Sequence, residues 1–230
     1  MAPRTREVCP VRSLQTTRND ARRQEFLIKM RMPWTKPREP DAAKTLYRLV
    51  VAQARHPAFY VGGVPDTLEG RYDMLVLHVF AVLRRLKSEA EMGRDLGQQL
   101  FDTLFDDMDA VLREIGVGDL SVGKKIRSMA EMFYGRITAY DIALRSDQDH
   151  ATALGTALAR NVFQGEDAAD EKGQQLARYV MAVLQDLEAQ PASDFVVGKI
   201  RFPEPDAYLA PMPRQTGHGD AMGPAGQEAG

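Results

Sequence analysis

The sequence of 230 residues contains a single cysteine, Cys9, which excludes an internal disulfide framework and a zinc site built on cysteines. A reducing compartment is the simple interpretation. No apolar run approaches the ~18–20 residues needed to span a bilayer. The longest uncharged stretch of the body, Met74 to Leu83, is typical of a buried core helix. Neither a cysteine near a histidine nor a G-x-S-x-G motif is present, so we expect no catalytic residue, metal ligand or cofactor.

The chain also lacks a strong excess of one charge. Its net charge is -2, which gives no reason to expect nucleic-acid sequence recognition. The charge is uneven, however. Residues 1–40 hold ten Lys or Arg against four Asp or Glu, residues 41–190 hold 17 against 23, and residues 191–230 hold 3 against 5. The first segment is also proline-containing and has no apolar signal core, so we predict a disordered basic arm or a mis-called start upstream of Met30 or Met32.

Alternating β-branched runs are nearly absent, and helical periodicity dominates instead. Apolar residues recur at steps of three and four, which predicts helices over about 41–56, 67–93, 96–116, 121–144, 149–164 and 170–190. We therefore expect one all-α domain of about six or seven helices over 41–190. Residues 194–202 are a short candidate for an extended segment, and the Pro- and Gly-rich remainder to 230 reads as a disordered tail.

The stretch GDLSVGKK, Gly118 to Lys125, contains the G-x-x-x-x-G-K spacing of a phosphate-binding loop. No strand precedes it, and Lys125 stands where that motif needs Ser or Thr. We interpret it as a joint between two helices, in which Gly116 ends the first and Ser121 caps the second. Asp119 would favour the helix dipole. Lys124 and Lys125, in the first turn of the second helix, would face outward or pair with an acidic partner.

Four aspartates crowd one predicted helix, and Asp102, Asp106 and Asp109 share a face of it. All-α prenyl-transferring enzymes hold magnesium with D-D-x-x-D, but here Ala110 occupies the last position. We favour a solvated or partner-facing acidic stripe. The alternative is an all-α enzyme that acts on an isoprenoid or quinone-like lipid through an Asp-rich magnesium site. His78, inside an apolar helix, is expected to be a hydrogen-bonded core histidine.

Three places combine aromatic residues with charges and glycines, around Phe59–Tyr60, Gly70 to Asp73, and Phe133 to Arg136. Because glycine inside a helix costs roughly 1 kcal/mol relative to alanine, Gly70 and Gly135 predict close helix–helix approach. Arg71 and Arg136 would pair with Asp66, Asp73 or Asp141. The set forms either an internal ion-pair lattice or a docking surface, and the two are compatible.

These segments, taken in order, resemble the ubiquinol–cytochrome c chaperone family over about residues 44–145. They are Phe59–Tyr60, Gly63 to Thr67, Gly70 to Asp73, Leu77–His78, Arg84 to Leu86, Leu100 to Asp102, Asp107 to Asp109, Leu112 to Asp119 and Phe133 to Arg136. The resemblance implies a non-enzymatic assembly chaperone for cytochrome b, a membrane subunit of ubiquinol–cytochrome c reductase. It also implies work near the ribosome and membrane, with a small partner protein.

We expect a protein of the bacterial cytoplasm, peripheral at the inner face of the membrane, or of the mitochondrial matrix if the source is eukaryotic. A hydrophobic client requires an accessible apolar groove, which a minority of the Met and Phe residues would line. The candidate partner-binding residues are Phe59, Tyr60, Asp66, Arg71, Tyr72, Arg85, Asp102, Asp106, Asp109, Asp119, Lys124, Lys125, Tyr134 and Arg136.

Overall fold

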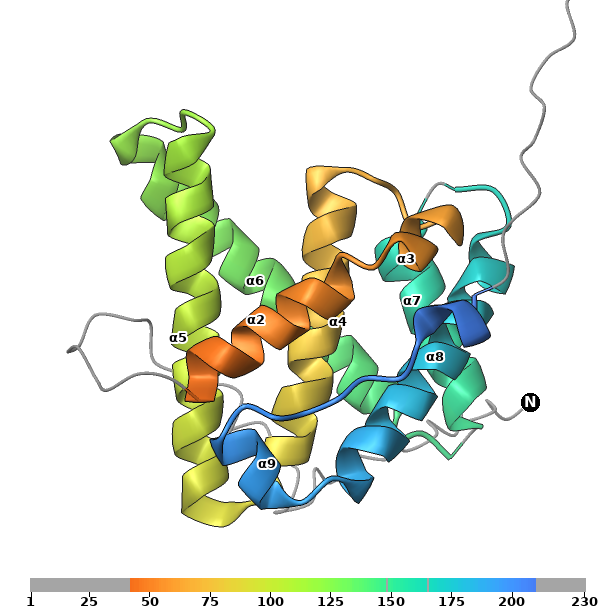
Figure 1. Ribbon diagram of the computed structural model, residues 1–230. Coiled ribbons are helices and arrows are strands. Elements are labelled where there is room, and N and C mark those ends of the chain that lie inside the picture. Colours follow the sequence, from red (N-terminus) through yellow and green to blue (C-terminus); the bar gives the residue numbers. More distant parts are fainter. Residues whose placement is uncertain (1–41, 148, 165, 210–230) are drawn as a thin grey trace, which may run out of the picture.

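The computed structural model describes residues 42–209 apart from 148 and 165, and it confirms an all-α domain. The predicted basic arm 1–40 and the tail after 209 lie outside the described residues. The longer helices are α2 (Ala42–Ala54), α4 (Leu68–Leu86), α5 (Ala90–Glu114), α6 (Asp119–Ala143), α7 (His150–Val162) and α8 (Ala169–Ala189). Two short helices, α3 (Pro57–Val61) and α9 (Ala192–Val196), and a 3₁₀ turn, η1 (Pro205–Ala207), complete the described part (Figure 1).

Helix α4 forms the centre of the domain, in contact with α2, α5, α6, α7 and α8 (Figure 1). Its uncharged stretch is buried on every side, as a helix that is apolar all round must be. Thr67 caps it by accepting a hydrogen bond from the Gly70 amide. The helix ends at Leu86, earlier than predicted. Gly93 belongs to the first turn of α5, where a Cβ atom would lie 1.9 Å from the Leu86 carbonyl oxygen.

Helices α5 and α6 form an antiparallel hairpin whose turn lies at the upper left of Figure 1. Gly116 has φ +84, and the Val117 amide donates to the Leu112 carbonyl, so the predicted glycine stop is confirmed. The predicted Ser121 cap is wrong. Helix α6 begins at Asp119 with Gly118 as its N-cap, and Ser121 lies exposed inside the first turn.

The close helix approach expected at Gly70 and Gly135 occurs elsewhere. A Cβ atom at Gly135 would meet nothing within 4 Å, and one at Gly70 would meet the Pro65 carbonyl of the preceding loop. Helices α7 and α8 make the tight contact instead, because a Cβ atom on Gly173 would lie 2.4 Å from the Gly155 carbonyl oxygen.

Residues 199–209, which we call the strap, run back over the domain after α9 (Figure 1). Residues 194–202, the candidate for an extended segment, start within α9, and those after Gly198 lie outside any helix or strand. The Gln190 side chain holds the strap by accepting from the Arg201 amide (2.8 Å) and donating to its carbonyl (2.9 Å). Phe195 of α9 and Ile200 of the strap itself are buried in the core.

A buried hydrogen-bond chain joins the strap to the centre of α4. His78 Nδ1 donates to the Met74 carbonyl (2.7 Å), so Nε2 accepts from the Tyr179 hydroxyl (2.8 Å). That hydroxyl accepts from Gln53, which also donates to the Pro203 carbonyl. Burial lowers the pKa of His78 to about 4, against a smaller opposing effect of the Met74 bond. The expected core histidine is confirmed, and it is neutral at pH 7.

The Tyr179→Phe substitution is expected to destabilise the fold by about 1–3 kcal/mol, because it leaves the buried acceptor of His78 without a donor. Chemical denaturation would measure the loss. Tyr208→Phe is the matched control, since the Tyr208 hydroxyl makes no hydrogen bond among the described residues and its ring also faces Tyr179. Equal stability of the two variants would contradict the proposed chain.

Candidate partner-binding surface

A cleft of about 590 Å³ opens between α2 and α5, and its two walls carry opposite charge. The lining comprises Lys44, Tyr47, Arg48, Val51, Ala52, Arg55, Thr103, Asp106 and Asp107. Cations stand on the α2 wall and carboxylates on the α5 wall. Among the residues that line this cleft, only Asp106 was predicted from the sequence to bind a partner. The other lining residues were not predicted.

The α2 wall presents cations that the fold itself does not use. Helix α2 buries one face through Leu46 and Val50, and the opposite face carries Lys44 and Arg48. Arg55 follows directly after the helix and lines the same wall. These three side chains are exposed and make no ion pair within the described part of the chain. The spacing of four and seven residues, which places them on one side of a helix, was visible in the sequence. They are available to an acidic partner.

The α5 wall is fixed by one hydrogen bond, from the Tyr47 hydroxyl to a carboxylate oxygen of Asp107 (2.7 Å). Burial and the bond to Asp107 raise the pKa of Tyr47, so its hydroxyl stays a donor. Asp106, beside it, is exposed and faces the cleft. The cleft therefore has one occupied carboxylate and one that is open to solvent.

The predicted acidic stripe does not gather into one site. Asp102 accepts from Gln98 (2.7 Å), and burial raises its pKa. Asp106 faces the cleft, and Asp109 pairs with Arg113 (2.6 Å). Within residues 42–209, these carboxylates form no group close enough to share a metal ion. This geometry does not support the Asp-rich magnesium site.

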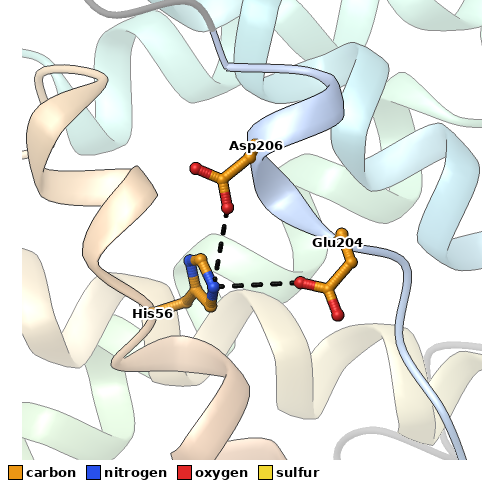
Figure 2. Close-up of side chains that lie close together, drawn as sticks. All are labelled: His56, Glu204 and Asp206. Atoms are coloured by element: carbon orange, nitrogen blue, oxygen red, sulfur yellow. Dashed lines mark ion pairs between the residues drawn. The ribbon is translucent and has the colours of Figure 1, made fainter.

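One other group does bring three potential ligands together, at the strap (Figure 2). His56 Nε2 lies 3.9 Å from Glu204 and 3.7 Å from Asp206. Its Nδ1 accepts from the Ala58 amide and caps α3, so Nε2 holds the ring proton and points it at the carboxylates. A metal would need the lone pair of that nitrogen. The group therefore acts as a polar contact between the strap and the start of α3.

Three predicted partner residues meet at the corner between α3 and α4. Arg71 pairs with Asp66 (2.7 Å), as predicted, and its guanidinium lies 5.9 Å from the centre of the Tyr60 ring. The Tyr60 hydroxyl donates to the Ala54 carbonyl (2.9 Å). Because the ion pair is exposed, it contributes little to stability and stays available for contact with another molecule.

Four other candidates are used inside the domain. Phe59 is fully buried against His78 and Tyr179. The Tyr72 hydroxyl donates to the Met129 carbonyl. Arg85 donates to the Leu187 and Gln190 carbonyls at the end of α8. Arg136 forms an ion pair with Asp73 at 2.5 Å. In this structure these side chains hold α4, α6 and α8 together. A role for them in partner contact stays a prediction.

The remaining candidates lie along the α5–α6 hairpin. Tyr134 is half-buried there, with its ring near Phe101. Arg113 pairs with both Asp109 and Asp119 across the turn. Lys124 and Lys125 are exposed in the second turn of α6, one turn further from its start than predicted, and make no ion pair with any described residue.

Comparison with known proteins identifies the family of this helical, cleft-bearing domain. A model of the ubiquinol-cytochrome C chaperone family matches residues 61–202, which is more than half of the chain. The chain belongs to that family, as the resemblance implied. The match extends further toward the C-terminus than the motifs did, and it starts after α2, so the cationic wall lies outside it.

Relatives with assigned names point the same way. The Ubiquinol-cytochrome-c reductase complex assembly factor 1 of Xenopus laevis is 27% identical over 68% of this chain and 77% of its own length. The mouse protein of that name is 27% identical over 70% of this chain, and the match spans only 54% of the mouse protein. The crystal structure of the Cbp3 homolog from Brucella abortus shares 33% identity at a TM-score of 0.64, covering 82% of this chain and 96% of that one. No described helix is both long and apolar enough to cross a membrane.

The buried pair of Asp73 and Arg136 generates a prediction about pH. Burial raises the pKa of Asp73 to about 6, although Arg136 opposes the rise. A raised carboxyl pKa gives stability that is complete below the unfolded value and lost as pH rises through the folded one. Arg136→Met should therefore cost about 3–5 kcal/mol at alkaline pH and less at acidic pH, where Asp73 can take up a proton.

Urea denaturation above and below the pKa of Asp73 tests this expectation. Arg71→Met serves as the control because it removes an exposed arginine from a similar pair, and it should change stability little at either pH. A loss for Arg136→Met that does not shrink on acidification would contradict the assignment of a buried charge to Asp73.

Proposed function

We propose that this protein is an assembly factor of ubiquinol–cytochrome c reductase that works by binding newly made cytochrome b, without a chemical step. Family membership over residues 61–202 is the observation that supports this most directly. The names of the frog and mouse relatives support the same role. The role in these names is that of the relatives, and we extend it to this chain on the basis of sequence similarity.

The cleft between α2 and α5 suggests how such binding works. Its rim is charged on both sides, and Val51 and Ala52 supply a small apolar patch between. The expected apolar groove lined by Met and Phe is not this cleft, since most of those residues lie in the core, including Met74, Phe101 and Phe133. The cleft instead suits a polar loop or terminus of the client, or a small partner protein, with acidic side chains facing the α2 cations.

The cellular consequence is specific. Deleting the gene should lower the amount of assembled ubiquinol–cytochrome c reductase while other respiratory enzymes persist, because the client of the factor belongs to one complex. Native electrophoresis with activity staining would measure both. Unchanged levels of the reductase would count against an assembly role, and loss of every respiratory enzyme would indicate a general defect.

The cleft itself is tested by charge reversal on α2. A variant with Arg48→Glu and Arg55→Glu should pull down roughly tenfold less cytochrome b from solubilised membranes, because it places like charges against an acidic client segment. The control carries Arg160→Glu and Arg178→Glu on α7 and α8, two exposed arginines far along the chain from the cleft. Mass spectrometry identifies what is captured, and equal capture by both variants would exclude the cleft as the client site.

A further inference from the structure

The end of the α5–α6 hairpin, residues 112–128, exposes side chains that the domain does not need. We call this segment the tip. Leu112 and Val122 are buried there but lie outside the main hydrophobic core. Hydrogen bonds from the Val117 amide to Leu112 and from the Ser121 amide to Gly118 fix the turn. Ile126, near the end of this segment, packs against the main core. The tip lies at one end of the domain, away from α7, α8 and α9 (Figure 1).

Two aliphatic side chains at this end face solvent. Leu120 is 101% exposed and Ile115 is 58% exposed, on either side of the turn. The space around Gly116, Gly118 and Gly123 is also open, since an added Cβ atom would meet nothing within 4 Å. Nothing in the described part of the chain covers these residues. Contact between water and the apolar side chain of Leu120 is unfavourable, so transfer of this side chain into an apolar environment would lower the free energy.

Cations follow the exposed leucine along α6. Leu120, Lys124 and Arg127 recur at steps of four and three, which places them in one stripe, and Lys125 lies beside it. None of the three cations has a partner among the described residues, whereas Arg113 is paired on both sides. The tip holds four basic and two acidic residues, within a region, 41–190, that is acidic as a whole.

We propose that the tip touches the surface of an anionic phospholipid membrane, with Leu120 inserted at the headgroup level and Lys124, Lys125 and Arg127 against the phosphates. Exposed aliphatic residues beside unpaired lysines are the pattern of an interfacial membrane contact. A protein partner is disfavoured because protein interfaces are enriched in aromatics and depleted in lysine, and the tip has no aromatic residue. RNA is disfavoured for the same lack, since bases stack on aromatic side chains.

A single-tryptophan reporter tests insertion in the full chain. The sequence has one tryptophan, Trp34, so Trp34→Phe with Leu120→Trp places the only indole at the tip. On vesicles of phosphatidylcholine with phosphatidylglycerol, its emission should shift to shorter wavelength and be quenched by brominated acyl chains. Vesicles of phosphatidylcholine alone should leave it unchanged. The control, Val197→Trp in the same Trp34→Phe background, reports from an exposed site at α9 and should not respond.

Vesicle co-sedimentation then tests the cations. Lys124→Gln with Lys125→Gln should weaken binding to the anionic vesicles by roughly fivefold for each cation removed, and added salt should weaken the wild type. Arg160→Gln with Arg178→Gln removes two exposed cations elsewhere and should bind like the wild type. The basic residues of 1–40 are present in every variant, so their contribution cancels.

An unshifted emission at position 120, or equal binding by the two double variants, would overturn the proposal. A response of the tip reporter to single-stranded RNA but not to vesicles would also overturn it, in favour of a nucleic-acid contact. The proposal goes beyond the assembly role, and none of these readouts involves the reductase. Failure here leaves the proposed function standing, and failure of the assembly experiments leaves the membrane contact standing.

Discussion

The burial of α4 on nearly all sides from Tyr72 onward is the constraint on which the rest of the domain depends. This part of the helix has no solvent-facing stripe, so each buried polar group that it carries must find its partner within the protein. His78 finds Tyr179, Asp73 finds Arg136, and Arg85 finds the last carbonyls of α8. These three contacts hold α8 and α6 around the same helix, and the strap closes over the first of them through Gln53.

The domain uses its charges in two ways. Those that point inward are paired and fix the packing of helices. Lys44 and Arg48 on α2, and Lys124, Lys125 and Arg127 at the tip, are unpaired within the described residues, and they leave the domain with a charged cleft and, at a different place, a cationic end. This division is what a binding protein needs, because its stability does not depend on the residues that it offers to other molecules.

The helices themselves could be predicted from the sequence because apolar residues recur with helical spacing, and an all-α chain leaves few alternatives. The pairing of Arg71 with Asp66 could also be predicted, since the two are neighbours in sequence. The cleft could not, because it joins Tyr47 to Asp107, and their distance along the chain hides their contact. The burial of Arg85 was equally hidden, since periodicity does not show that the Leu187 and Gln190 carbonyls accept hydrogen bonds from its guanidinium. Arg136, by contrast, pairs with Asp73, one of the partners predicted for it.

The way in which Gln190 holds the strap has a consequence for variation. Its amide pairs with the backbone of Arg201 and not with that residue's side chain. Any amino acid except proline can offer the same amide and carbonyl, so position 201 is free to change its charge or size without releasing the segment. A label or a cross-linker placed there would sit on an anchored backbone while its side chain points to solvent.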